Sequence, residues 1–563
     1  MRIRTSAAIA GFTVIGSLCL FSAGQTRPVD QPLASLAPLN PAYVRAIESS
    51  SSRLPSPQDI TPLQGLSRYT DTTLPSVYDL RESYRVTAVR NQIPVSTCTI
   101  FGLFGSLEST LKPFETCDFS ENHLDGSTEE SDILEANVGA LARWADPVWE
   151  EDDPWEGGLP YDPSFPAVKH VQKVVFLPPR ADASDNDRIK RAVIDLGAVC
   201  TEIYFIRNLL NATYNSYYNT TVMTDLQAVA IIGWNDDFNR EKFSPQPPGD
   251  GAFLCKNSLG GNFGDAGYFY VSYYDGFLGR LSLPAVFTAE PAAGLTQNYQ
   301  YDPVGCTARL GYGSETAWFA NQFVSVSTDP LAAVSFYSYG ATGEYQVSVY
   351  GNATPGLPLS GALVSRFQGT LETAGYATLR LPEPVPLAVN ERFSVVVRLR
   401  NPENNFPIPL EHPVPGFDAL FQAGLNQSFI SADGLVWKDL VTYEGTTYAR
   451  SNVCLKAFAG FPPVYPPAYL RVDRLVNDLV FYKEYVDKLS WSPHPGNTET
   501  IVAHRIYRKV KGAPNDSYEF LDETGTKDLT YYVRGLSEDS AYAYRLTAVT
   551  NSGREGDPSE VVD

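Results

Sequence analysis

Apolar residues recur three and four positions apart in several segments of the first half of the chain, the spacing of amphipathic helices. Such helices are predicted at residues 40–48, from Cys98 onward, at 131–144 and at 185–196. Gly197 follows the last of them and is a typical helix terminator. After this point short apolar runs bounded by turn residues take over and predict strands at 198–205, 227–234, 252–256 and 267–273. Residues 74–290 are therefore predicted to be an α+β unit, with its helices first and its strands second.

The second half of the chain has the alternation of β-strands, separated by turns rich in Gly and Pro. Strands are predicted at 316–323, 332–337, 345–350, 393–399 and 449–458, and later at 489–491, 529–533 and 542–549. Residues 291–460 and 468–563 thus read as two all-β sandwiches, joined by a stiff Pro-rich linker at 461–467. Because each is bounded by Gly/Pro-rich sequence, both are expected to fold alone. We call 74–290, 291–460 and 468–563 the first, second and third blocks.

The N-terminal residues 1–24 carry Arg2 and Arg4, an apolar stretch and a small-residue end at Gly24, which predicts a secretory signal peptide. The apolar stretch is too short for a comfortable membrane span. Cys19 lies inside it and is expected to be removed with it; a lipid-attached Cys19 is the alternative. Residues 25–73 are rich in Pro and Ser and predict a flexible leader, with a remnant pro-segment as the alternative.

The charge and cysteine content of the chain argue against several classes of function. Lys and Arg total 43 against 64 Asp and Glu, a net charge of −21 without a basic cluster, which argues against a nucleic-acid partner. The seven cysteines are spread thinly with no C-x-x-C motif, so no structural zinc site and no other cofactor is predicted. The remaining six cysteines belong to a chain predicted to be exported, and their spacing does not determine a pairing.

Cys98 is the first candidate for chemistry, because it stands at the start of its predicted helix. There the helix dipole favours a thiolate, and Ser96 or Thr97 can cap the helix. Gln92, six residues upstream, can supply a side-chain amide donor. A thiolate with a nearby amide donor is the skeleton of a cysteine nucleophile and its oxyanion hole. A buried structural cysteine is the alternative.

The residues before Cys98 resemble the opening of the mature domain in papain-like cysteine peptidases. Residues 74–81 and 86–92 follow the family pattern P-x-x-Y-D-L-R … V-x-x-Q. The resemblance implies a two-lobed α+β fold with a cleft between the lobes, Cys98 as the nucleophile and Gln92 as the oxyanion donor. Residues 96–99 read Ser-Thr-Cys-Thr, where the family has Gly-Ser-Cys-Trp.

The family's remaining catalytic residues are only partly kept. Residues 226–234 stand where the family carries G-H-A-V-x-x-V-G-[WY], and Gln227 occupies the position of the general-base histidine. Residues 256–260 follow K-N-S-W-G, so the orienting Asn257 is present while Leu259 replaces the tryptophan that shields it. A neutral amide at position 227 can neither accept a proton nor pair with a thiolate. His123 and His170, the two histidines of the first block, fall at positions that the resemblance puts away from the cleft centre.

We therefore predict an exported papain-like protein with a degenerate site, which acts by binding peptide or cell-surface material. Two alternatives stay open. One is a working cysteine endopeptidase with Cys98 as nucleophile. The other is surface adhesion through the C-terminal β domains.

The β blocks also resemble known modules. The second resembles the lectin-like sandwich that follows the peptidase unit in some exported bacterial and archaeal papain relatives, and the third a fibronectin type III module with Trp491 as its early core residue. Trp318 and Trp437 can stack on sugar faces, with core packing as the alternative. The expected partners are a peptide or protein segment in the cleft and a cell-surface glycan or protein at the β domains. No transmembrane segment is expected after signal cleavage.

Overall fold

The computed structural model describes residues 32–48, 54–59, 63, 71–95, 97–115, 117–128, 133–155, 160–223, 225–340, 342–417 and 421–563. The predicted signal peptide, part of the predicted leader and the candidate cap Ser96 lie outside the described residues. Residues 34–563 form one compact unit. Within the described residues no helix combines the length and the apolarity that crossing a membrane requires.

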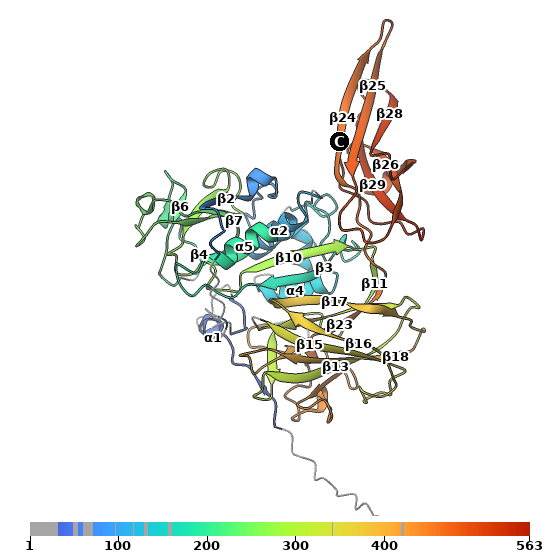
Figure 1. The fold of residues 1–563 in the computed structure, drawn as a ribbon. Helices are drawn as coiled ribbons and strands as arrows, with labels where there is room; N and C mark the ends of the chain where they lie inside the picture. The colour runs from blue at the N-terminus through green and yellow to red at the C-terminus, as the bar shows by residue number, and fades with distance from the viewer. Residues whose placement is uncertain are drawn as a thin grey trace, which may run out of the picture. The chain divides into compact units, whose positions relative to one another are not determined.

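The helices in the described residues are α1 (Pro41–Glu48), α2 (Cys98–Leu111), α3 (Glu121–Ser127), α4 (Leu134–Ala142) and α5 (Asp187–Asp195). Four of them form within the predicted segments, and α3 was not predicted. Gly197, with φ of +149°, follows α5 as expected of a terminator. Helix α2 is buried along nearly its whole length, since it packs against strands on one side and α3 on another. It is the central helix of the first block (Figure 1).

The strands of the first block surround β7 (Leu226–Asn235), which pairs with β2 (Val77–Asp79), β4 (Val199–Tyr204) and β8 (Ala252–Lys256). Next to β8 comes β9 (Tyr268–Ser272), followed by β6 (Ser216–Tyr217) and β5 (Leu210–Asn211). The buried face of this sheet gathers a core that includes Val229, Ile231 and Trp234. Every residue of β7 but the last is buried, so the strand that carries Gln227 is held on both faces.

One sheet of thirteen strands continues from the first block into the second. Two strands that the sequence pattern did not single out make the connection: β3 (Lys169–Phe176) and β10 (Ala285–Pro291) pair with each other, and β3 also pairs with β17 (Ala374–Val385). Beyond β17 follow β14 (Leu331–Ser338), β23 (Leu455–Gly460) and β11 (Leu295–Tyr299). The first two blocks therefore share backbone hydrogen bonds and are not separated by a linker.

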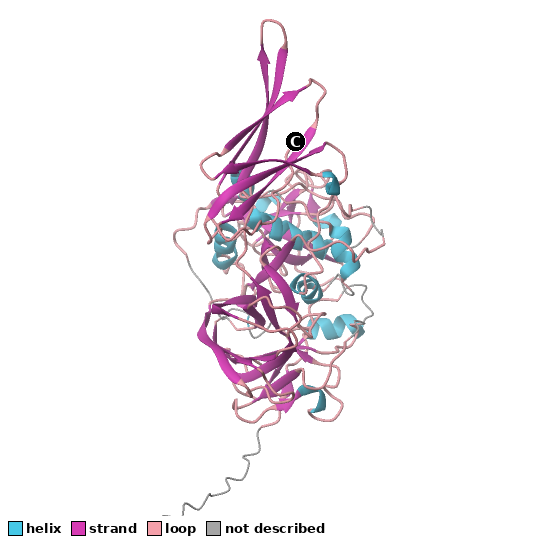
Figure 2. Cartoon of the chain, turned by 90° about the vertical axis from the view of Figure 1, so that its right-hand side faces the viewer, coloured by secondary structure: helices cyan, strands magenta, loops and turns pink. Residues whose placement is uncertain are grey.

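The second block faces this part of the sheet with a six-stranded sheet. It comprises β16 (Ala362–Leu371), β15 (Gly343–Gly351), β18 (Arg392–Arg400), β13 (Thr316–Val324), β20 (Ser428–Ser431) and β21 (Lys438–Asp439). Phe319, Val334 and Val397 belong to the core between the two layers. Figure 2 shows this region built almost wholly of strands. Trp437 packs half-buried against the outer face of the six-stranded sheet, and Arg398 lies 5.7 Å from the ring of Trp318.

The described part of the predicted leader is ordered against the second block, in contrast to the expected flexible segment. Strand β1 (Ser35–Leu36) pairs with β12 (Ala308–Gly311) in a small sheet that also holds β19 (Ile408–Glu411) and β22 (Asn452–Val453). Tyr43 is fully buried in an apolar cluster, and its hydroxyl donates to the Pro415 carbonyl oxygen at 2.7 Å. Strand pairing and the burial of this aromatic side chain together hold the segment in place.

The third block has its own core. Strands β24 (Ala468–Asp478), β25 (Lys483–Ser492) and β28 (Thr530–Leu536) form one sheet, and β27 (Glu519–Gly525), β26 (Ile501–Val510) and β29 (Tyr542–Thr550) form the other. Leu489, Trp491 and Ile506 are buried between them. The Tyr544 hydroxyl donates to Asp487 Oδ2 at 2.7 Å. The three strands predicted from the sequence all lie in this sandwich.

Because β17 loses its partner β3 when the blocks are separated, we expect the second and third blocks to behave differently in isolation. Residues 468–563 should fold alone and melt cooperatively, whereas residues 291–460 should expose the apolar sheet edge at 374–377 and aggregate or remain partly unfolded. Circular dichroism melts and proton NMR spectra of the two fragments test this. A well-dispersed, monomeric 291–460 fragment would contradict the importance of the shared sheet.

Candidate active site

Cys98 is the first residue of α2 and its side chain has no exposed surface. Its sulfur accepts a hydrogen bond from the backbone N–H of Ala228 at 3.0 Å and lies 3.9 Å from the carbonyl oxygen of Leu226. The thiol thus lies against strand β7 beside Gln227. Thr97 is the N-cap residue but makes no side-chain capping bond, so the predicted Thr97 cap is wrong. Its β-hydroxyl is instead turned into the buried interior.

The other three predicted site residues come together in one buried cluster of amides. Gln227 Nε2 lies 2.9 Å from Asn257 Oδ1 and 3.1 Å from Gln92 Oε1, and donates to both. Ser258 joins them, since its hydroxyl donates to Gln92 Oε1 at 2.6 Å. Gln227 is only 7% exposed and the others less. The cluster therefore ties the segment before α2 to β7 and to the loop after β8.

This arrangement bears on the oxyanion-donor role expected of Gln92. Its side-chain oxygen accepts from both Gln227 and Ser258, and its amino group lies 3.5 Å from the carbonyl oxygen of Val95. The donor end of the amide is directed at the loop before Cys98. A donor to an oxyanion must point at the place where negative charge develops, so the oxyanion role of Gln92 stays a prediction.

All five histidines of the chain lie within the described residues, and each is engaged away from Cys98. His123 Nδ1 lies 2.8 Å from Asp146 Oδ1, and the His170 ring stacks on Trp144 with 3.7 Å between centroids. The rest contact Ser451 (His412), Tyr465 (His494) and Trp491 (His504). Burial lowers the pKa of His170 to about 3, so that ring is neutral over the physiological range. None of these contacts supplies an imidazole to the cluster around Gln227.

A partly apolar rim surrounds the segment that leads into Cys98. The Trp155 indole donates to the Asn91 carbonyl oxygen at 3.0 Å and meets Phe101 edge-on, with 5.1 Å between ring centroids. Asn91 also forms a β-bridge with Leu259, the residue at the family's tryptophan position. Ile93 extends from the same loop and is largely exposed. Asn257 nevertheless remains buried, so the replacement by Leu259 does not open it to water.

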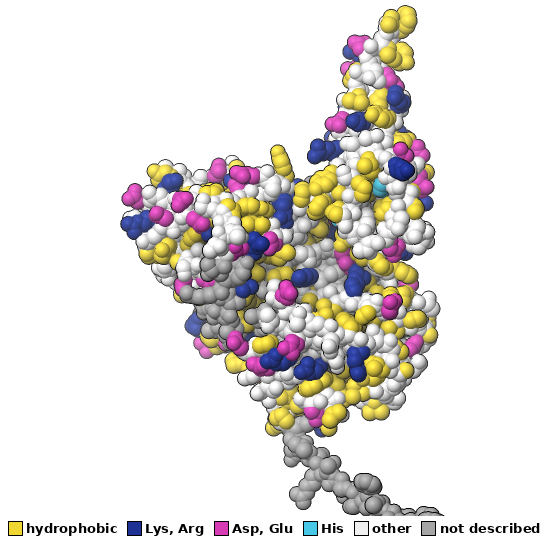
Figure 3. Space-filling view, in the orientation of Figure 1, with side chains coloured by type: hydrophobic (Ala, Val, Ile, Leu, Met, Phe, Trp, Pro, Cys, Tyr) yellow, Lys and Arg dark blue, Asp and Glu magenta, His cyan; other side chains and the backbone are white. Residues whose placement is uncertain are grey.

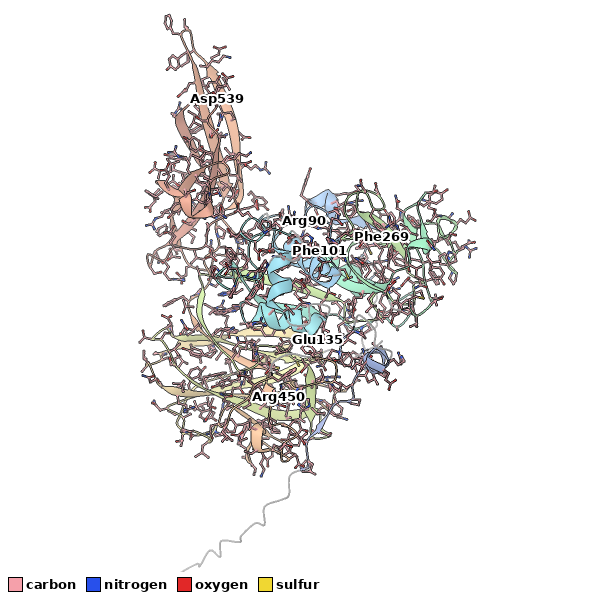
Figure 4. All side chains as sticks on the ribbon, turned by 180° about the vertical axis from the view of Figure 1, so that it is seen from behind. Arg90, Phe101, Glu135, Phe269, Arg450 and Asp539 are labelled. Carbon is pink, nitrogen blue, oxygen red and sulfur yellow. The ribbon has the colours of Figure 1, made fainter. Side chains whose placement is uncertain are left out.

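Behind the amide cluster, buried charges join the two parts of the first block. The Thr87 hydroxyl bonds to the Glu108 carboxylate of α2 and accepts from Lys256 Nζ of β8 at 2.9 Å. Burial raises the pKa of Glu108 and lowers that of Lys256, and each charge partly offsets the shift of the other. A cavity of about 10 Å³ beside them has room for about one water molecule. Arg90 and Phe101, which help to line it, lie close together in Figure 4.

Helix α2 reaches β7 this closely because it has glycine where the two meet. A Cβ at Gly102 would lie 3.2 Å from Cys200 Sγ and 3.3 Å from the Ala228 side chain. These distances are shorter than ordinary van der Waals contact. The small residues of both elements thus fix how near Cys98, one turn earlier, lies to the strand.

Two family models match the chain. The model described as "Papain family cysteine protease" matches residues 74–276, and the model described as "Lectin like domain" matches residues 298–459. The chain contains a papain-family domain followed by a lectin-like domain. No curated protein matches the chain.

Solved structures share this order of domains. A crystal structure of the cysteine protease and lectin-like domains of Cwp84, described as a surface layer associated protein of Clostridium difficile, is 21% identical, with a TM-score of 0.66 over 76% of this chain and 98% of that one. The clostridial cysteine protease Cwp84 after propeptide cleavage is 22% identical, with a TM-score of 0.60 over 69% of this chain and all of that one. At these identities the likeness establishes the fold.

The predicted fold class is confirmed for an α+β papain-like domain followed by a β-rich lectin-like region. The fibronectin type III assignment of the third block stays a prediction, as do the domain boundaries. The sequence patterns did not predict that Ser258 joins the amide cluster, although it lies inside the K-N-S-W-G motif. They also missed Trp155 and the Glu108–Thr87–Lys256 contact, whose partners are far apart in the sequence.

We expect Cys98→Ala to leave the fold intact. The substitution removes one buried sulfur and one weak acceptor, which costs about 1–2 kcal/mol and lowers the melting temperature by a few degrees. Differential scanning calorimetry of the purified chain measures this. Unfolding of the first block would instead assign Cys98 a structural role.

The buried charges should behave as a coupled pair. Lys256→Met removes the cation that partly offsets the burial of Glu108, which it meets only through Thr87, and should cost about 1–3 kcal/mol, while Glu108→Gln with Lys256→Met should recover part of that loss. Denaturant unfolding of the two single variants and the double variant gives the coupling energy. As a control, Lys511→Met breaks the exposed pair with Asp563 and should cost less than about 1 kcal/mol. Additive single effects would show that the two charges act independently.

Proposed function

We propose that the papain-family domain is a pseudopeptidase that binds an extended peptide or protein segment and does not turn it over. The observation that carries the proposal is the placement of Gln227. At the position of the general base it donates to Asn257 and Gln92, and so joins a set of hydrogen bonds between neutral groups. The Asn257 side chain, to which the family resemblance gives the role of orienting the base, here accepts a hydrogen bond from an amide.

The chemical consequence concerns both halves of peptide hydrolysis. Attack by Cys98 requires a thiolate, which an adjacent imidazolium stabilises, and departure of the amine requires an acid. An amide at Gln227 supplies neither a positive charge nor a transferable proton at any physiological pH. The helix dipole at the start of α2 contributes only about 0.3–1 kcal/mol toward the thiolate. Cys98 in this setting is a weak nucleophile with no partner for the second step.

Binding, in contrast, needs only surface that the domain retains. The rim formed by Ile93, Trp155 and Leu259 offers exposed or half-exposed apolar and aromatic groups beside the cleft position. Such groups provide much of the binding energy for extended peptides, while backbone groups of the rim set register. Export to the cell surface completes the proposal, so the ligand is a peptide or protein segment encountered outside the cell.

Adhesion through the β domains is the second candidate function. The half-buried Trp318 and Trp437 of the lectin-like domain favour it, because each leaves part of an aromatic face accessible. Trp437 also packs against Phe429 and its neighbours, which limits the area left for a sugar ring. We therefore rank peptide binding by the first domain above glycan binding by the second.

Restoring the base tests the proposal. Wild type should not hydrolyse a mixed fluorogenic peptide library above the rate of its Cys98→Ala variant, whereas Gln227→His should show weak cleavage that Cys98→Ala abolishes. General acid–base groups typically contribute about 10²–10⁴-fold, so even an imperfect pair should exceed the detection limit.

Gln227→Asn is the matched control, because it alters the same cluster but keeps a neutral amide; it should remain inactive. Alkylation of Cys98 near neutral pH gives an independent measure, and wild type should react no faster than an ordinary thiol. Robust wild-type cleavage that depends on Cys98 would refute the pseudopeptidase and establish the endopeptidase alternative.

A further inference from the structure

The third block carries four consecutive exposed apolar residues at the turn between β24 and β25. We call Leu479, Val480, Phe481 and Tyr482 the hairpin tip. Val480 is 92% exposed, Phe481 95% and Tyr482 65%. Figure 3 shows hydrophobic side chains gathered at the end of this hairpin. Isolated exposed apolar residues are ordinary on protein surfaces, but a run of four at a turn, where polar residues normally stand, is not.

The tip projects beyond the sheet that supports it. The pairing of β24 with β25 continues to Asp478 opposite Lys483, whereas β28 ends opposite Tyr485. The last pairs of the hairpin therefore have no third strand beside them. The turn is closed by the Leu479 N–H, which donates to the Tyr482 carbonyl oxygen at 3.0 Å. The apex is convex, and some of its backbone hydrogen-bonding groups are paired within the turn.

Charges begin just below the tip and come in opposite pairs. Asp478 stands opposite Lys483 across the hairpin. One position further down, Glu484 accepts from Arg534 Nη1 and from Asn477 Nδ2, both at 2.9 Å. Leu475 and Val476 add exposed apolar surface beside these pairs. Along the hairpin axis, polarity thus changes from aliphatic and aromatic groups at the apex, through the amphipathic Tyr482, to paired charges.

We propose that the hairpin tip inserts into the surface of a zwitterionic lipid bilayer. The order of side chains matches the order of a bilayer interface: acyl chains for Val480 and Phe481, the headgroup boundary for Tyr482, and water for the paired charges. A convex apolar apex needs a medium that yields around it, which lipid does. This goes beyond the proposed peptide binding, since it concerns a different domain and a different partner.

The net charge of the chain determines whether a neutral or an anionic lipid surface is favoured. With a net charge of −21 the protein is repelled by an anionic surface, and the paired charges below the tip offer no excess of cations to counter this. Binding should therefore be stronger to neutral vesicles than to anionic ones, and the preference should weaken as salt screens the repulsion.

Vesicle flotation tests the proposal. The chain is produced from Gln25 onward, without the apolar N-terminal stretch that would bind lipid by itself, and is mixed with phosphatidylcholine vesicles. Wild type should float with the vesicles, and Val480→Ser with Phe481→Ser should lower the partition coefficient at least about tenfold. Binding to the neutral vesicles should persist from about 0.1 M to about 1 M salt, because it does not depend on charge.

Leu435→Ser with Val326→Ser is the matched control: these residues are also largely exposed, at 80% and 64%, but lie in the lectin-like domain. This control should float like wild type. Equal flotation of the tip variant and wild type, or no flotation of wild type, would overturn the proposal. A wild-type oligomer that the tip substitutions dissociate, without any vesicle binding, would identify a second copy as the occupant and likewise overturn it.

A fluorophore reports insertion directly. The six cysteines among the described residues are buried, so Phe481→Cys offers a single accessible thiol for an environment-sensitive dye. Its emission should rise and shift to the blue on neutral vesicles, while the same dye at Leu435→Cys should not respond. A tip label that stays in water while the protein floats would place lipid binding elsewhere on the chain and refute the proposal.

Discussion

The close contact between α2 and β7 sets the geometry on which the candidate site depends. Gly102 and Gly105 on the helix face Ala228 and Ala230 on the strand, and no larger side chain separates the two backbones. At this distance the first turn of α2 places the Cys98 sulfur against the backbone N–H of Ala228. Gln227, one position earlier on the strand, then lies beside the thiol. Packing of small residues, more than any polar contact, therefore decides what can face the thiol.

Within that geometry the identity of residue 227 decides the chemistry. Gln227 forms the contacts with Asn257 and Gln92 through donors alone, and Ser258 completes the set. The side-chain amino group of Gln227 is hydrogen-bonded within the cluster, which favours a buried amide at this position, whereas Asn257 Nδ2 is buried without a hydrogen-bond partner. Gln227, Asn257, Gln92 and Ser258 thus hold one another through side-chain hydrogen bonds that involve no imidazole.

The sequence predicted the parts that depend on local pattern. Motif spacing brought Gln92, Gln227 and Asn257 to one site, and helical periodicity located α2 and α5 within a few residues. Pairing between distant strands was not predictable. Strands β3 and β17 are about two hundred residues apart, and the hydrophobic pattern of a strand does not show which other strand it pairs with. For the same reason the order of the leader was missed: it rests on the pairing of β1 with β12 and on the burial of Tyr43 among residues of both the papain-family and the lectin-like domains. In both cases contacts between residues far apart in the sequence determine the structure, and local propensity does not reveal them.

The shared sheet also has a mechanical meaning. Strands β3 and β17 run antiparallel and exchange backbone hydrogen bonds over the register from Ala374 opposite Phe176 to Ala377 opposite Lys173. A pulling force directed along these strands loads all of the bonds at once, in shear, whereas a flexible linker would simply extend. If the lectin-like domain is held to a surface while the papain-family domain is bound to a ligand, tension passes through this ladder into β3 and from there into β10, which packs against α2. The joint between the domains is in that sense a rigid mechanical coupling.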